Sequence, residues 1–206
     1  MRTIKTYALS EDTLEKDLDK FIRAAKGGAY QFDYKCGGEG LKLIKAYFRM
    51  IEAEYKQDNY AVARACYKNL MFLLLQSDYN YFNYEDIVGK LNFEKFIGNY
   101  FTCLIHTCDA DELFKEYVEY LKVKVDYGFD SAHVTIINSL PEPSLSRFME
   151  LVTKEAENVT EEDYAMHDMI DLLLDMAKSR SNKEEFDRLS KKYEHILGDD
   201  MDGELA

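Results

Sequence analysis

Four side chains that could bind a metal ion lie within seven positions of FTCLIHTCDADE, residues 101–112. They are Cys103, His106, Cys108 and Asp109, in a chain that holds only four Cys and four His. Thiolate, imidazole and carboxylate groups are the ligands of zinc, which structural sites hold with four of them in a tetrahedron. The composition of this stretch therefore raises the hypothesis of a zinc site and a metal-dependent enzyme.

The spacing argues against convergence of these ligands. The apolar residues before them recur with a helical period, and a helix turns by about 100° per residue. Cys103 and His106 then lie on one flank, whereas Cys108 points to nearly the opposite side from His106. The ligands would converge only if the helix ended before Cys108 and the chain turned back. We therefore expect no metal and no cofactor.

A second set of candidate ligands is His167, Asp171 and Asp175, at positions i, i+4 and i+8. On a helix this spacing places one imidazole and two carboxylates along one side, as a divalent cation requires. The same segment carries an apolar stripe that these residues flank or oppose, which is typical of a solvated acidic face. The chain also lacks a phosphate-binding Gly-rich motif, a GxSxG sequence and a Ser/His/Asp set, so the sequence predicts no enzyme.

The elements that position these residues are predicted to be helices. Apolar residues recur at helical spacing over long runs, and the chain has only two Pro. Short polar residues that commonly cap helices precede several runs, among them Ser10, Asn92, Asp109, Asp130 and Ser144. Two further helix starts show the capping-box pattern: SNKE at 181–184 matches it fully, and TEED at 160–163 matches it closely. The predicted helices are residues 10–26, 39–56, 60–76, 92–105, 109–125, 130–137, 144–156, 160–177 and 181–197.

This order of elements predicts an all-α fold. After the first helix, the helices form four antiparallel pairs with mostly short turns, which can stack as a short α-solenoid. A compact α-helical bundle is the alternative. The predicted parts are an N-terminal helix with a Gly-rich loop (1–38), a helical repeat domain (39–197) and an acidic tail (198–206).

One helical pair carries a family pattern. Within AYFRMIEAEYKQDNYAVARACYKNLM, residues 46–71, Tyr47 supplies a large aromatic side chain, Tyr60 stands at the turn, and Ala63 and Tyr67 follow in the second helix. With these residues the stretch resembles one tetratricopeptide repeat, a helix–turn–helix unit of about 34 residues. It departs from the family at Ile51 and Leu70, where the family prefers small residues.

The resemblance implies a function in protein–protein interaction, with a peptide or protein bound in the groove of the repeat. Some members of the family clamp a peptide carboxylate with Lys and Asn, but this chain has Phe48 and Glu52 at those positions. We do not expect that mode of binding. The residues expected to contact the partner from this pair are Tyr47, Glu54 and Tyr55.

A second contact surface is predicted in the connection after the third helix. Four aromatic residues stand within six positions there, Tyr79, Tyr81, Phe82 and Tyr84. Aromatic side chains dominate the binding energy of protein interfaces. The alternative is that this connection folds back and fills the space between helical pairs, with its phenols at the surface.

Charge restricts the class of partner. A net charge of −13 disfavours nucleic acid and anionic membrane surfaces as partners. We interpret the negative charge as a means of keeping the protein soluble, and attraction to a basic protein partner is the alternative. Residues 150–175 hold nine acids and one base, whereas residues 178–192 hold six bases and three acids. These segments could attract one another within the fold or between copies, so a self-assembling structural or regulatory subunit is the alternative function. The sequence shows no signal peptide and no apolar run that spans a membrane, and the Cys spacing is not that of a disulfide scaffold, which predicts a cytoplasmic protein.

Overall fold

The computed structural model describes residues 9–31, 38–76, 81–82, 87–124 and 128–197. Over these residues the secondary structure is helical and no strand occurs, so the all-α prediction is confirmed. None of the helices in this part of the chain combines the length and apolar character needed to cross a bilayer.

The chain divides into two compact units, Met1–Thr107 and Cys108–Ala206. The division falls between the fourth and fifth helices, inside the range predicted as one repeat domain. The first unit contains α1 (Leu14–Lys26), α2 (Glu39–Tyr55), α3 (Tyr60–Gln76), the 3-10 turn η2 (Val88–Lys90) and α4 (Phe93–Thr107). The second unit contains α5 (Ala110–Lys124), α6 (Ser131–Ser139), α7 (Glu142–Ala156), α8 (Tyr164–Ser179) and α9 (Lys183–Leu197).

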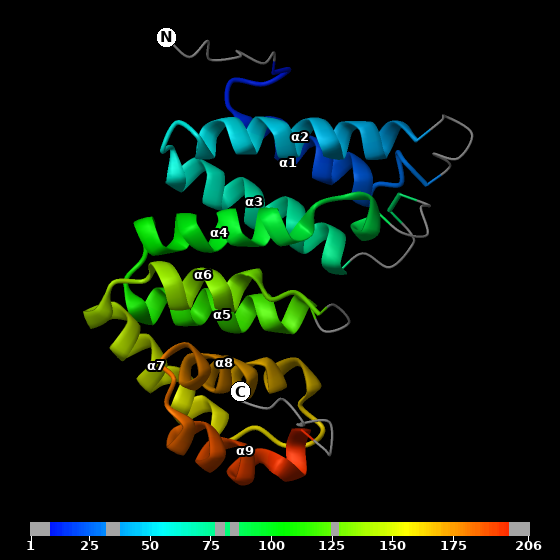
Figure 1. The fold of residues 1–206 in the computed structure, drawn as a ribbon. Helices are drawn as coiled ribbons and strands as arrows, with labels where there is room; N and C mark the ends of the chain where they lie inside the picture. The colour runs from blue at the N-terminus through cyan, green and yellow to red at the C-terminus, as the bar shows by residue number, and fades with distance from the viewer. Residues whose placement is uncertain (1–8, 32–37, 77–80, 83–86, 125–127, 198–206) are drawn as a thin grey trace. The chain divides into compact units, whose positions relative to one another are not determined.

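In the first unit, α3 is the central helix and packs against α1, α2 and α4 (Figure 1). A helix with neighbours on several sides needs apolar residues around most of its circumference. The sequence of α3 meets this need, because Met71 and Leu75 extend the predicted apolar stripe to a second face and are buried with it. Ala63 is fully buried as well.

In the second unit, α8 has the same role. It packs against α5, α6, α7 and α9, and buries a nearly continuous apolar run from Met169 to Ala177. Helix α7 packs against α5 and α8, so the second unit has a core shared by more than one helical pair.

Two of the predicted helix starts are confirmed in detail. The Asn92 side chain accepts a hydrogen bond from the backbone N–H of Lys95 at 3.2 Å. The Asp109 side chain accepts one from the backbone N–H of Glu112 at 2.8 Å. Each bond satisfies an N–H that the first turn of a helix leaves without a backbone partner.

Other predicted caps are wrong by one to three residues. Helix α1 is capped by Thr13 instead of Ser10. Helix α7 begins after Pro141 and not at Ser144, because proline suits the start of a helix. Helix α9 is capped by Asn182, whose side chain accepts from the Glu185 N–H at 3.1 Å, while Ser181 adopts a left-handed φ of 51°.

The bonds between Thr160 and Asp163 do form, but they close a turn that precedes α8. The N–H and hydroxyl of Thr160 donate to Asp163 Oδ2 at 3.0 and 2.6 Å, and the helix itself begins at Tyr164. Asp130 stands at the N-cap position of α6 as predicted, but its side chain makes no capping bond.

Candidate functional site

The candidate zinc ligands of residues 101–112 have separate environments. Cys103 is fully buried in α4, and burial raises the pKa of its thiol to about 12. His106 is exposed and stacks on the Tyr60 ring, with centroids 4.3 Å apart and planes 4° from parallel. Cys108 begins the second unit and is half-buried. Within the described ranges, no group of three or more His, Cys, Asp or Glu residues is arranged to hold a metal ion.

The predicted acidic face of α8 is partly turned inward. Asp175 Oδ2 lies 3.1 Å from Nδ1 of His133 on α6, a buried imidazole that is 5% exposed. His167 lies elsewhere, with Nε2 3.1 Å from the Thr160 carbonyl oxygen. Asp171 stays exposed, yet the surrounding protein and the carboxylates of Asp168 and Asp175 raise its pKa. These three side chains therefore have different environments, and in the described part of the chain they form no group arranged to hold a metal ion.

A buried polar cluster links α5, α6 and α8, and no local sequence pattern indicates it. Lys124 is 5% exposed and pairs with Asp168. The Tyr117 hydroxyl lies 3.0 Å from Nε2 of His133 and 3.2 Å from the Asp168 carbonyl oxygen. Burial, with the carboxylate of Asp168 adding to it, raises the pKa of Tyr117 well above its usual value. The neutral phenol and the enclosed ion pair indicate a structural role.

Two of the aromatic residues predicted to bind a partner belong to the core. Tyr47 is 7% exposed, and its hydroxyl donates to Asp17 Oδ2 at 3.0 Å. Phe82 is 2% exposed and stacks against Phe21 and Tyr30, at centroid distances of 6.0 and 5.9 Å. Phe82 thus fills space between elements, as the alternative interpretation of this loop proposed.

The remaining predicted contact residues are half-buried or lie outside the described part of the chain. Tyr81 is half-buried, and Tyr79 and Tyr84 fall outside the described residues. At the end of α2, Glu54 accepts a hydrogen bond from the Asn59 amide at 2.7 Å. The Tyr55 ring meets Tyr60 edge-on at 5.8 Å.

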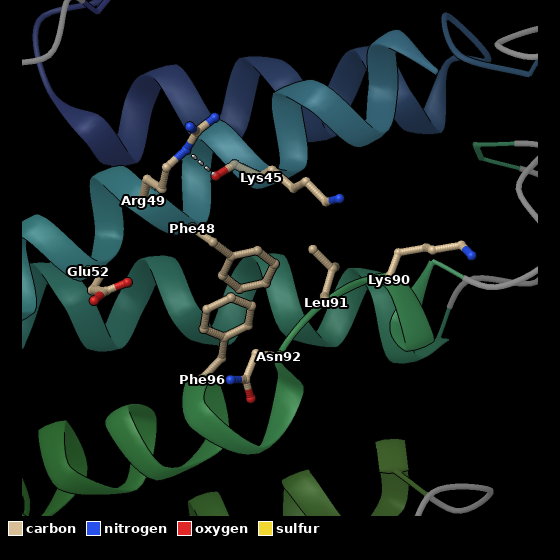
Figure 2. Close-up of a pocket in the computed structure, with 8 residues that line it drawn as sticks. All are labelled: Lys45, Phe48, Arg49, Glu52, Lys90, Leu91, Asn92 and Phe96. Atoms are coloured by element: carbon tan, nitrogen blue, oxygen red, sulfur yellow. Dashed lines mark hydrogen bonds between the residues drawn. The ribbon is translucent and has the colours of Figure 1, made fainter. Parts of the chain in front are cut away.

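A pocket of about 340 Å³ lies beside α2, the segment after η2 and the first turn of α4. At its centre, Phe48 of α2 and Phe96 of α4 face one another with ring centroids 3.8 Å apart and planes 6° from parallel (Figure 2). Both rings also contact Phe93 and Tyr67, so the apolar floor of the pocket is the edge of an aromatic core cluster. Leu91 extends this floor.

Positive charges surround this floor. Lys45 and Arg49 come from α2 and Lys90 from η2, and all three are exposed. Figure 2 shows Lys45 and Lys90 on one side of the two rings and Glu52 on the other. Arg49 donates from Nε to the Lys45 carbonyl oxygen at 3.1 Å. Among the residues that the structure describes, none of the three cations has a carboxylate partner.

The single acid of the pocket is already neutralised. Glu52 accepts from Lys56 at 2.5 Å and from Lys95 at 2.7 Å. Burial raises the pKa of Glu52. The hydrogen bonds from these two lysines and their charges together lower it by more, so the pKa of Glu52 lies below its usual value. The α4 N-terminus, with its partial positive charge, adjoins the pocket through Asn92. The pocket is therefore positive in a chain whose net charge is −13.

Part of this pocket could be predicted from the spacing of residues in the sequence. Lys45, Phe48, Arg49 and Glu52 stand at i, i+3, i+4 and i+7, which places them on one face of α2. The contribution of Lys90 and Leu91 follows from tertiary packing and has no local pattern. No protein-family model matches the chain, and neither a curated protein nor a solved structure is significantly similar to it.

Proposed function

We propose that the protein is an interaction module of the helical-repeat class, which docks a segment of a partner protein in the pocket on the first unit. The observation that carries the proposal is the aromatic floor of Phe48 and Phe96 beside three cations that lack a carboxylate partner in the described chain. An apolar floor with a few placed polar groups is the usual composition of a binding site.

The chemistry of the pocket specifies the segment. Its floor suits an apolar or aromatic side chain, and Lys45, Arg49 and Lys90 suit carboxylates on either side of it. The net charge of the whole chain is negative, but exposed charges act over only about 8 Å at physiological salt, so the cations of the pocket decide binding at this site. The partner segment is therefore acidic with an apolar anchor.

The tetratricopeptide-like arrangement is part of the same proposal. The pocket uses a face of α2, the first helix of the pair that resembles such a repeat, and α2 packs on α3, in which Ala63 is buried. In this proposal the helical pairs stack as a short solenoid and the exposed faces of the first helices receive the partner.

Peptide binding tests the proposal directly. Fluorescence anisotropy with labelled Asp-Glu-Phe-Glu-Asp should show saturable binding to the protein, and Asn-Gln-Phe-Gln-Asn should bind at least about tenfold more weakly. The variant Lys45→Glu/Arg49→Glu should lose binding of the acidic peptide. Lys42→Glu/Lys115→Glu is the matched control, because it reverses two exposed lysines outside the pocket. Equal binding by both variants would contradict the proposed site.

A further inference from the structure

The chain itself contains an acidic segment with an aromatic anchor. Tyr164 begins α8 and is 72% exposed, which is rare for a large hydrophobic side chain in the described residues. Glu161, Glu162 and Asp163 come directly before it, and all three are exposed. We call residues 160–164 the acidic corner. Its composition matches the segment that the pocket on the first unit requires.

Local bonds hold the acidic corner in a defined shape. Asp163 accepts from both the N–H and the hydroxyl of Thr160, and these bonds lower the pKa of its carboxyl. His167 contacts the corner twice, through the Thr160 carbonyl oxygen at 3.1 Å and the Tyr164 ring at a centroid distance of 5.5 Å. A preformed segment loses less conformational entropy when it binds, so this corner is suited to docking.

We propose that the acidic corner of one copy docks in the pocket of a second copy, with the Tyr164 ring on the floor formed by Phe48, Phe96 and Leu91. This proposal rests on the proposed function of the pocket and names a partner for it. The three acids of the corner then face the three cations of the rim, Lys45, Arg49 and Lys90. The partner copy thus supplies an aromatic side chain for the floor and carboxylates for these three cations.

This contact differs from the contacts of a symmetric dimer. The pocket lies in the first unit and the acidic corner in the second, so each copy offers two different surfaces. Such a heterologous contact joins copies head to tail, and association continues until a ring closes or the concentration limits it. Since exposed charges dominate the contact, salt weakens it.

Sedimentation velocity on two complementary variants tests the proposal. The pocket variant, Lys45→Glu/Arg49→Glu, keeps its acidic corner, and the corner variant, Tyr164→Ala, keeps its pocket. Wild-type protein should form species that grow with concentration, and 500 mM NaCl should weaken this association by about tenfold or more. Each variant alone should be monomeric. Their equimolar mixture should form a one-to-one dimer that does not grow, because that pair has only one intact contact.

Three results would overturn the proposal. They are a wild-type protein that stays monomeric at all concentrations, a corner variant that associates as wild type does, and a mixture that stays monomeric. Glu161→Lys/Glu162→Lys provides a second corner variant and should behave like Tyr164→Ala, with circular dichroism confirming that each variant is folded. Binding of the acidic peptide to the same samples separates the two proposals. If wild type binds the peptide but stays monomeric, only the self-docking proposal fails. If wild type neither binds the peptide nor associates with itself, the proposed function of the pocket fails as well.

Discussion

The Tyr47 hydroxyl donates to Asp17 Oδ2 at 3.0 Å, which joins α2 to a carboxylate that is 6% exposed on α1. The other oxygen of Asp17 accepts from the N–H and the hydroxyl of Ser10, at 2.9 and 2.5 Å, and from the Glu11 N–H at 3.1 Å. One buried carboxylate therefore fixes the chain before α1 and the contact between α1 and α2. Burial raises the pKa of Asp17, but these hydrogen bonds bring it below its usual value.

Replacement of Asp17 by Asn should destabilise the first unit and reduce its sensitivity to acid. The variant loses hydrogen bonds to a charged acceptor, which contribute about 1.5–3 kcal/mol each to stability, and the amide recovers part of this. Because the folded-state pKa of Asp17 is lowered, its contribution is present above the unfolded-state pKa of about 3.9 and is lost as the pH falls through the folded-state value.

Urea unfolding at neutral pH and at several acid values measures both effects. Wild type should lose more free energy of unfolding than Asp17→Asn between neutral pH and the region below the usual Asp pKa. Asp19→Asn, a change at an exposed carboxylate on the same helix, is the control and should follow wild type. If the free energy of unfolding changed equally with pH in wild type and Asp17→Asn, the Asp17 carboxylate would not be stabilised by these hydrogen bonds.

The helices were predictable because their apolar periodicity is local. Asn92 and Asp109 were also predictable as caps, since each directly precedes an apolar run. The ends of α1 and α9 were not, because neighbouring polar residues compete to cap and tertiary contacts decide between them. Ser10 is engaged by the inward-facing Asp17, which leaves Thr13 as the cap of α1.

The candidate site depends on long-range contacts that the sequence does not encode locally. Phe48 has the helical spacing of an apolar residue in α2, but its stacking partner Phe96 lies 48 positions further on, in α4. For Tyr47, the neighbour of Phe48, the resemblance to a tetratricopeptide repeat implies a contact with the partner. Tyr47 is buried because Asp17 provides an acceptor for its hydroxyl inside the unit. Charged residues in the core, such as Lys124, likewise contradict the simple apolar pattern.

The ion pair between Lys124 and Asp168 should matter more for stability than an exposed pair. Lys124 is 5% exposed, so Lys124→Met leaves Asp168 without its cation in a partly enclosed site and should cost about 3–5 kcal/mol. The double variant Lys124→Met/Asp168→Leu should recover part of this loss, because both charges are then removed. Thermal unfolding of the two single variants, the double variant and wild type gives the coupling free energy.

The exposed pair between Arg147 and Asp111 is the matched control for this cycle. It also joins α5 to another helix, with an N–O distance of 2.8 Å, but its side chains are about half exposed. Water solvates and screens such a pair, so its coupling free energy should be clearly smaller. A coupling for Lys124 and Asp168 no larger than that of the control would show that the buried pair does not hold α5 against α8.

The more exposed a thiol is, the faster it should react with an alkylating reagent. The thiolate is the reactive form, and burial, to which nearby acids add at Cys66, raises the pKa of Cys66 and Cys103 to about 12. At pH 8 both should stay unlabelled until the protein unfolds, whereas the half-buried Cys108 should react in the native state. A Cys36→Ser background removes the cysteine that lies outside the described residues, and mass spectrometry then counts the labels.

This labelling also tests whether Cys103, His106 and Cys108 converge to bind zinc. Zinc bound by Cys103, His106 and Cys108 would protect both thiols together, and a chelator would then make both reactive. Separate environments predict instead that Cys108 reacts alone and that the chelator leaves its rate unchanged, because Cys103 is enclosed by the core and His106 is stacked on Tyr60. Joint protection of the two thiols that a chelator relieves would restore the metal site and would place Cys108 beside His106.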